Sequence, residues 1–155
     1  MTVASVNVDD TSYVPDKSTL TTAVDFGRIT LAGNLLLYIF GTPGAQRFWY
    51  MWDELIQGAI GAVLLVDTRR LADSFPGVDY FEASGLPFVI GVNSFYGQFP
   101  HSLNDVRHAL AVSPTVPVIQ CDARDGGSAK AILITLIEHA MSLAETEQHA
   151  RPDKP

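Results

Sequence analysis

Short apolar runs alternate with helical stretches along most of the chain, and this alternation restricts the fold more than any other feature. Buried strands are predicted over residues 59–67, 88–92 and 116–121. Helices are predicted over residues 47–57 and 75–84, from Ser102 onward, and over 129–144. Strands that alternate with helices form mostly parallel sheets with helices on both faces. The predicted fold class is therefore α/β.

An antiparallel hairpin precedes the alternating part. Residues 22–31 carry apolar side chains on both faces of a predicted strand, and Ala32-Gly33-Asn34 supplies a turn. The apolar run 35–40 then pairs back on the first strand. The predicted sheet is thus parallel apart from one antiparallel edge strand.

The domain organisation follows from length and composition. A chain of 155 residues suits a single domain, because domains cluster near roughly 100–150 residues. Residues 1–18 show neither helical nor strand periodicity and are predicted to be irregular. Residues 19–144 form the predicted domain, and the polar residues 145–155 form a flexible tail.

Charge, cysteine content and apolar run length exclude several classes of function. The net charge is −7, so the chain is poorly suited to contact nucleic-acid phosphates. The single cysteine, Cys121, cannot form an intramolecular disulfide, which fits a reducing compartment. The longest apolar run, 59–66, is far shorter than the ~20 residues that span a bilayer. The sequence predicts a cytoplasmic protein that neither binds nucleic acid nor spans a membrane.

Two motifs flank the hairpin. Val24-Asp25-Phe26 lies at its start, and the run GTPGAQRF follows it at residues 41–48. In this order they resemble the switch regions of small Ras-like GTPases. With the runs at residues 48–53 and 66–71, the sequence resembles more closely the actinobacterial conservon-type small GTPases, over residues 1–144. The resemblance implies a P-loop NTPase sandwich of three layers that binds GTP or GDP with Mg²⁺ in signal transduction.

On the phosphate side, the resemblance implies roles for four residues. Thr21 matches the threonine that joins the magnesium shell, and Gly44 matches the glycine whose amide meets the γ-phosphate. Thr42 lies in the same loop and belongs to the implied nucleotide-binding set. Ala45 stands where these enzymes have the glutamine that orients water. Gln46 is one residue late and is a weak substitute for that catalytic glutamine.

On the base side, the resemblance places Asn93 in an N-K-x-D motif and Asp122 and Ala123 in an S-A-K motif. Ala123 would then present its backbone amide to the base. Tyr96 stands where N-K-x-D has its aspartate, and a tyrosine cannot accept the two hydrogen bonds that guanine donates. The preference for guanine is therefore expected to be weakened.

The largest departures from the family concern phosphate binding. No G-x-x-x-x-G-K-S/T segment, whose amides and lysine hold phosphates, occurs in the sequence. The first strand and the P-loop of the fold are therefore predicted to be missing. Gly41 also replaces the aspartate that helps to hold the magnesium ion.

Three interpretations follow. The leading one is a signalling protein, impaired in nucleotide binding and hydrolysis, that acts by recognising partners. The resemblance implies a roadblock-type regulator and, through it, a sensor kinase-like protein that recruits the chain to a membrane. The second is an active GTPase, converting GTP to GDP and phosphate, whose start lies upstream of Met1. The third is a decayed fragment, because a sheet without its central strand exposes unpaired inner edges.

Other conspicuous residues have structural interpretations. Trp52 is predicted to pack in the core, whereas Trp49 is left open between packing and a partner surface. Asp67 and the residues after it are predicted to cap a helix. Cys121 is predicted to be a small buried hydrophobic residue. Four histidines are predicted to lie on the surface without forming a metal site: His101, His108, His139 and His149.

Overall fold

The chain forms one six-stranded sheet covered by helices. The computed structural model describes residues 2–7, 25–30, 36–43, 49–95 and 97–150. The strands are β1 Thr2–Asn7, β2 Asp25–Thr30, β3 Leu36–Pro43, β4 Ala59–Val66, β5 Phe88–Asn93 and β6 Val118–Cys121. The helices are α1 Trp49–Leu55, α2 Phe75–Ser84, α3 Leu103–Leu110 and α4 Gly126–Ala150, with a 3₁₀ helix, η4, over Thr68–Ser74.

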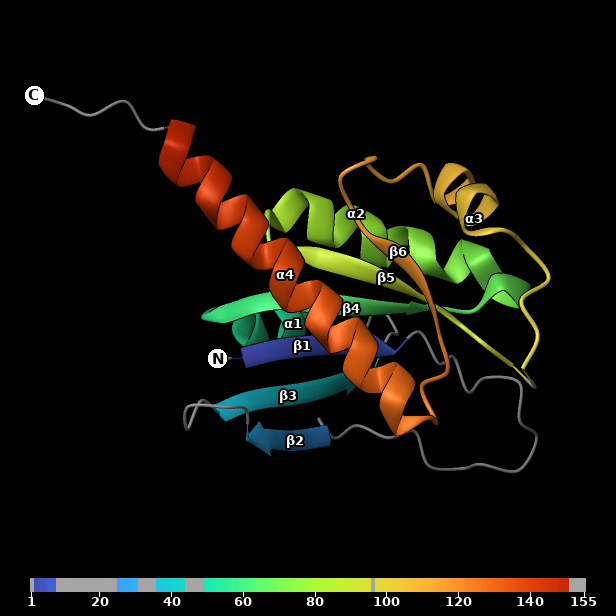
Figure 1. Cartoon of the computed structure of the whole chain (residues 1–155), viewed down its shortest axis with the longest axis horizontal. Helices are drawn as coiled ribbons and strands as arrows, with labels where there is room; N and C mark the ends of the chain where they lie inside the picture. The colour runs from blue at the N-terminus through green and yellow to red at the C-terminus, as the bar shows by residue number, and fades with distance from the viewer. Residues whose placement is uncertain (1, 8–24, 31–35, 44–48, 96, 151–155) are drawn as a thin grey trace, which may run out of the picture.

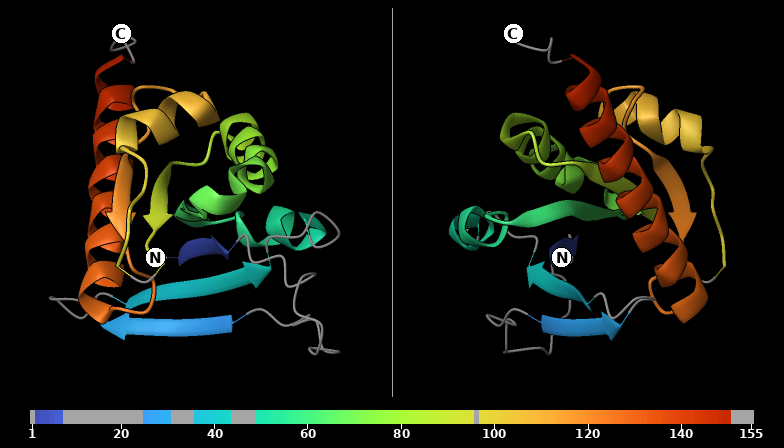
Figure 2. Two further views of the ribbon diagram at one scale, coloured as in Figure 1. Left: turned by 90° about the vertical axis from the view of Figure 1, so that its right-hand side faces the viewer. Right: turned by 60° about the vertical axis from the view of Figure 1, so that its left-hand side comes forward.

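The strand order is β2-β3-β1-β4-β5-β6 (Figure 1). β2 pairs antiparallel with β3, and every other pairing among the described strands is parallel. α4 covers one face of the sheet, and α1, α2 and α3 cover the other (Figures 1 and 2). The predicted three-layer α/β fold with one antiparallel edge strand is confirmed.

The prediction that the first strand of the fold is missing is wrong. Thr2–Asn7 forms β1, which lies at the centre of the sheet and pairs with β3 on one side and β4 on the other. The segment is rich in small and β-branched residues, and such residues suit a central strand. A strand enclosed by neighbours needs no alternation of polar and apolar residues, so these six residues carry no pattern that identifies a strand. β1 pairs with the inner edges of β3 and β4, so the argument for a decayed fragment, which rested on unpaired edges, no longer holds.

Two further boundaries differ from the predictions. β3 includes Gly41–Pro43, which were expected in a loop, because β1 extends the ladder as far as the pair Asn7 and Pro43. α4 continues to Ala150, beyond the expected end near Ala144. Glu145, Gln148 and their neighbours favour helix, and the next proline is Pro152. Residues 145–150 are therefore helical and do not belong to a flexible tail.

The core has two parts, one on each face of the sheet. On the α1–α3 face, Leu64, Phe81 and Ile90 are at most 1% exposed. On the α4 face, Val89 and Leu136 are each 0% exposed. Alternate residues of β4 point to opposite faces, which explains why this strand reads as one continuous apolar run.

Two glycines allow α4 to lie close to the sheet. A Cβ atom on Gly91 would lie 2.5 Å from Ile132 Cδ1 and 3.0 Å from Cys121 Sγ. A Cβ atom on Gly61 would lie 2.7 Å from both Leu136 Cδ1 and the carbonyl oxygen of Pro87. These distances are shorter than van der Waals contact, so any larger residue would push the helix away from the strands.

Local capping sets the helix boundaries of the β4–β6 part. Ser102 accepts a hydrogen bond from the Asp105 amide at 3.1 Å, which confirms the predicted N-cap of α3. α2 begins with a proline in its first turn and ends at Gly85, which has a left-handed φ of 69°. α3 ends at Ala111, whose φ of 53° is unusual for a residue with a side chain. Among the described helices, none is long and apolar enough to cross a membrane.

Candidate functional site

Three adjacent parallel strands end in polar residues at the same edge of the sheet. Asp67 follows β4, Asn93 is the last residue of β5, and Asp122 follows β6. In open α/β sheets, ligands bind outside the carboxyl ends of the strands. The edge formed by these three residues is therefore the candidate site.

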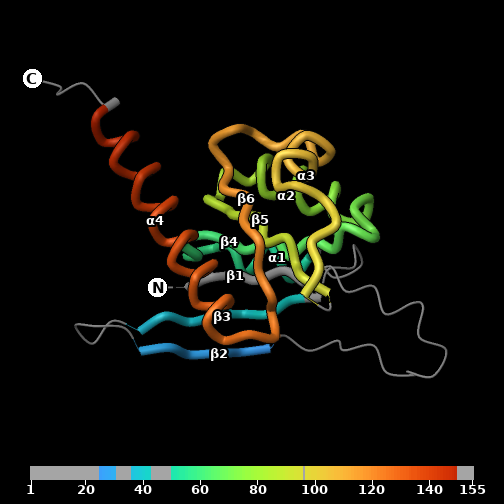
Figure 3. Tube along the Cα trace, turned by 45° about the vertical axis from the view of Figure 1, so that its right-hand side comes forward, coloured from blue at the N-terminus to red at the C-terminus, as the bar shows by residue number. Residues whose placement is uncertain are grey.

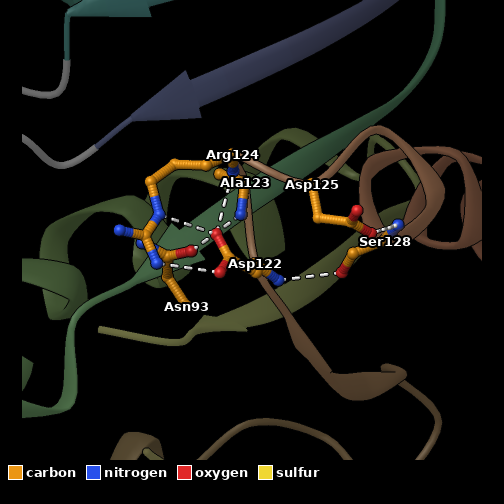
Figure 4. A network of polar contacts seen from close by, with 6 residues as sticks. All are labelled: Asn93, Asp122, Ala123, Arg124, Asp125 and Ser128. Atoms are coloured by element: carbon orange, nitrogen blue, oxygen red, sulfur yellow. Dashed lines mark hydrogen bonds and ion pairs between the residues drawn. The ribbon is translucent and has the colours of Figure 1, made fainter. Parts of the chain in front are cut away.

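The base-side residues predicted from sequence come together at this edge. The Ala123 amide donates a hydrogen bond to Asn93 Oδ1 at 3.0 Å, which joins the β5 and β6 ends (Figure 4). The Ser94 amide donates to the Cys121 carbonyl at 2.7 Å and fixes the same two strand ends. The structure thus places Asn93, Asp122 and Ala123 in one cluster. It also shows that the Ala123 amide is already used inside the protein.

Asp122 is held by its own loop. Its carboxylate accepts hydrogen bonds from Arg124 Nε at 3.0 Å and from a terminal nitrogen of that guanidinium at 2.9 Å (Figure 4). These bonds, together with one from the Arg124 amide, lower the pKa of the Asp122 carboxyl to about 2. The Asp122 amide donates to Ser128 Oγ, and the Ser128 amide donates to Asp125 at the start of α4. The loop is therefore tied to the first turn of α4.

An equivalent arrangement occurs at the end of β4. Asp67 accepts hydrogen bonds from the Arg69 amide, Nε and a terminal guanidinium nitrogen at distances of 2.9, 2.9 and 2.6 Å. Burial raises the pKa of the Asp67 carboxyl, but the bonds from Arg69 outweigh this effect and leave the pKa lowered. The Arg69 guanidinium carbon lies 3.6 Å from the centre of the Phe95 ring, in a cation–π contact. Asp67 caps η4, as predicted.

We call the arrangements Asp67–Arg69 and Asp122–Arg124 the two D-x-R clamps. Sequence reasoning did not identify them as a pair, although the repeated spacing of an aspartate at a strand end and an arginine two residues later was a usable signal. The clamps flank the end of β5, because β4 and β6 lie on either side of it. Both guanidinium groups are thereby paired within the protein.

The base-side residues fit a nucleotide only in part. A base carbonyl that accepts from the Ala123 amide must first displace Asn93 Oδ1. A base amine that donates to Asp122 must compete with a bidentate arginine. Within the described part of the chain, no group of three His, Cys, Asp or Glu residues is placed to hold a metal ion.

The phosphate-side predictions have a different outcome. Thr21, Gly44, Ala45 and Gln46 lie outside the described residues, as does Tyr96 of the base-reading motif. Thr42 was expected in a loop that contacts nucleotide. It lies in β3 and is 3% exposed, so its side chain is enclosed by the sheet and its cover. The expected loop position of Thr42 is therefore wrong, whereas its contact with nucleotide stays a prediction.

The strand opposite position 41 explains why a glycine, and not an aspartate, is found there. It lies directly opposite Asp25 in the β2–β3 ladder, and a Cβ atom at Gly41 would lie 3.3 Å from Asp25 Cβ. An aspartate at position 41 would face a second carboxylate across the strand pair, and like charges in that position are destabilising. The glycine therefore suits the aspartate at position 25.

The remaining conspicuous side chains are structural. Cys121 is 3% exposed, and burial raises the pKa of its thiol to about 11, so it is a buried hydrophobic residue as predicted. Trp52 is 2% exposed and packs in the core, as predicted, while the Trp49 side chain is not among those described. His139 is half-buried and burial lowers its pKa, whereas His101 and His108 are exposed.

Comparisons with known proteins agree with the fold class. Residues 1–143 match the family described as conserved hypothetical ATP binding protein. The chain is also similar to an uncharacterized protein of Methanocaldococcus jannaschii, with 28% identity over 76 residues. That match covers 48% of this chain and 49% of the archaeal protein, so it spans about half the length of each. The chain belongs to the conserved hypothetical ATP-binding protein family, a nucleotide-binding family of P-loop NTPases.

Proposed function

We propose that the chain is a signalling protein related to small GTPases that binds nucleotide weakly and acts mainly by recognising protein partners. One observation carries the proposal: the base-side groups at the sheet edge satisfy one another. The Ala123 amide is bound by Asn93, and the Asp122 carboxylate is bound by Arg124. A nucleotide has to replace these bonds rather than fill vacant positions.

We do not expect the phosphate side to add compensating affinity. In P-loop proteins, most of the attraction for the phosphates comes from loop amides and a lysine, and the sequence has no G-x-x-x-x-G-K-S/T segment. Each internal hydrogen bond that a base displaces costs about 1 kcal/mol net. We therefore expect that neither GTP nor ATP binds with the affinity of an intact P-loop protein.

A surface for partners lies on the other half of the fold. Tyr50 on α1 is 67% exposed, and Phe26 on the edge strand β2 is 60% exposed. Phe26 packs beside Tyr38 and Phe40, with ring centroids 5.8 and 5.3 Å apart. Exposed aromatic residues are enriched among those that dominate protein interfaces. We call Phe26, Tyr38, Phe40 and Tyr50 the aromatic surface.

The protein itself holds α1 in position. Trp52 stacks on Phe81 with ring centroids 5.7 Å apart and an angle of 6° between the rings. The Tyr80 hydroxyl donates a 2.6 Å hydrogen bond to Asp53 Oδ1, and burial together with this bond raises the pKa of Tyr80. α1 is thus fastened to α2 without contributions from a ligand. A surface held in this way is suited to a partner that binds irrespective of nucleotide.

The family resemblance suggests which partners to test. A roadblock-type regulator is the first candidate, and a sensor kinase-like membrane protein is the second. In this proposal the chain works in the cytoplasm and reaches the membrane through these partners. GTP or GDP with Mg²⁺ remains the nucleotide pair to test, because the family binds nucleotides.

Titration with a fluorescent GTP analogue and magnesium tests the nucleotide part. We expect no saturable binding in the micromolar range, and no difference between competition by GTP and by ATP. A variant with Tyr96→Asp restores the carboxylate of the base-reading motif, and it should favour GTP over ATP if any base is bound. Binding of the unmodified chain at micromolar or tighter affinity contradicts the proposed deficiency.

Binding to the candidate regulator tests the partner part. Tyr50→Ala should weaken the complex by roughly tenfold or more if Tyr50 is a central contact. Phe75→Ala is the matched control, since Phe75 is 41% exposed on α2, outside the aromatic surface. Isothermal titration calorimetry of both variants gives the comparison. Equal loss in the two variants, or no loss in either, rules out the aromatic surface as the contact.

A further inference from the structure

α4 extends beyond the sheet that it covers. It has 25 residues and is about 37 Å long. The longest strands have 8 residues and are about 26 Å long. Figure 1 shows the C-terminal part of α4 projecting past the strands, and residues 141–149 are all exposed. The second half of this helix therefore has no packing surface among the described residues.

An apolar row follows one side of α4. Ile134 is 45% exposed and Met141 is 59% exposed, with the half-buried Ile137 between them. The exposed Ala144 continues the row, so its members recur at spacings of three and four residues. The row is distinct from the face that packs on the sheet, where Leu136 is 0% exposed. Spacing of this kind is typical of helices that pair with another helix.

A small apolar cavity lies on the side of α4 that faces the sheet. Leu133, next to Ile134 and one turn before Ile137, lines a cavity of about 200 Å³ between α4 and the strands. The other lining residues are Ile39, Val63, Leu65, Cys121 and Ala123 at the sheet, and Ala129 and Ile132 on α4.

We propose that the row is the contact between two copies of the chain, with their α4 helices antiparallel about a two-fold axis near Ile137. A two-fold contact requires one patch that is complementary to itself. The row meets this requirement: Ile134 of one copy lies opposite Met141 of the other.

Charge complementarity supports a second copy as the occupant. Lys130 and Glu145 are both exposed and lie at opposite ends of the row. In an antiparallel pair, Lys130 of each copy lies beside Glu145 of the other, which gives two equivalent ion pairs. Glu138 borders the row near the axis, where the two copies bring like charges together. The dimer is therefore weak, and removing this charge strengthens it.

Sedimentation equilibrium of the full chain, from micromolar to millimolar concentration, tests the proposal. The unmodified chain should dimerise reversibly, and Glu138→Gln should tighten the dimer. Met141→Glu should weaken it by roughly tenfold or more, because a charge without a partner becomes buried. Ala109→Glu is the matched control: it adds the same charge at an exposed position of α3, away from α4. Thermal unfolding at low concentration should be unchanged in all three variants, since none of these residues is in the core.

Charge reversal tests the antiparallel arrangement. Lys130→Glu and Glu145→Lys should each weaken the dimer several-fold, and the double variant should restore it. A chain that stays monomeric at millimolar concentration overturns the proposal. So does equal loss of dimer in Met141→Glu and Ala109→Glu, or a double variant no better than either single one. Binding of the row to lipid vesicles by a chain that does not dimerise would also overturn it.

Discussion

The two halves of the sheet differ in how completely they are packed. In the half formed by β4, β5 and β6, core residues such as Val66 and Ile90 are 0% exposed, and both faces carry helices. In the hairpin of β2 and β3, Phe26 is 60% exposed and Ile29 is 39% exposed. Figure 3 shows the hairpin at the margin of the domain, away from α2 and α3. The first half stabilises the fold, and the second half presents a surface.

The same contrast applies to polar groups. At the ends of β4 and β6, the two D-x-R clamps pair the charges within each loop. By contrast, the Tyr50 and Phe26 side chains of the aromatic surface are largely exposed to solvent. The occupied edge and the exposed aromatic rings are the two observations that support the proposed role in recognising partners.

The largest expected effect separates two aromatic residues of α1. Trp52→Ala should lower the free energy of unfolding by about 3–5 kcal/mol, because it removes a buried ring that stacks on Phe81. Tyr50→Ala should change it by less than about 0.5 kcal/mol, because Tyr50 is largely exposed. Urea unfolding of both variants measures the difference. Similar losses would show that α1 is not anchored by Trp52 alone.

The next effect compares glycines in the two halves. Gly91→Ala should destabilise the protein by about 1–3 kcal/mol, because the new methyl group collides with Ile132 and Cys121. Gly27→Ala on β2 is the control, since its Cβ would lie 3.7 Å from Ile39 Cβ, an ordinary contact. Chemical denaturation should show little change for that variant. A tolerated Gly91→Ala would mean that α4 can move away from the sheet at little cost.

A smaller effect is expected at Ala111, in the well-packed half. Its φ of 53° is strained for alanine, whereas glycine adopts it freely. Ala111→Gly should therefore stabilise the protein by about 0.5–1 kcal/mol. A calorimetric melt measures the shift. A lower melting temperature would show that the left-handed end of α3 is not the dominant local conformation.

The smallest effect concerns pH and the Asp122–Arg124 clamp. The pKa of Asp122 is lowered from 3.8 to about 2 in the folded state, so the carboxylate stabilises the fold above about pH 4. This contribution is lost as the pH falls from about 4 to about 2, when the folded protein must also bind the proton. Asp122→Asn should flatten the loss of stability in that window, as measured by denaturation at each pH. An unchanged slope would show that the clamp does not persist in solution.

Much of the fold could be predicted from the sequence because its signals are local. The apolar run of β4 and the amphipathic pattern of α4 are long, and Ser102 carries its own capping signal. β1 was missed because Thr2–Asn7 carries no pattern of its own. It becomes a strand only through its pairing with β3 and β4.

The candidate site was predictable to a similar degree. Asn93 and Ala123 were identified through their motifs, and the structure brings them within 3.0 Å of each other. Thr42 was assigned to a loop because a Gly-Thr-Pro-Gly run resembles a turn, yet pairing with β1 makes it part of a buried strand. The roles of Thr21, Gly44 and Gln46 stay predictions, since these residues lie outside the described part of the chain.

The sequence by itself determined the alternation of strands and helices, the hairpin and the absence of a G-x-x-x-x-G-K-S/T segment. Periodicity and turn residues act over a few positions, so they can be read without knowing the fold. Only the tertiary structure decided that β1 occupies the centre of the sheet and that the base-side groups bind one another. Contacts between Asn93 and Ala123 join residues 30 positions apart, and such distances are set by the packing of the strands.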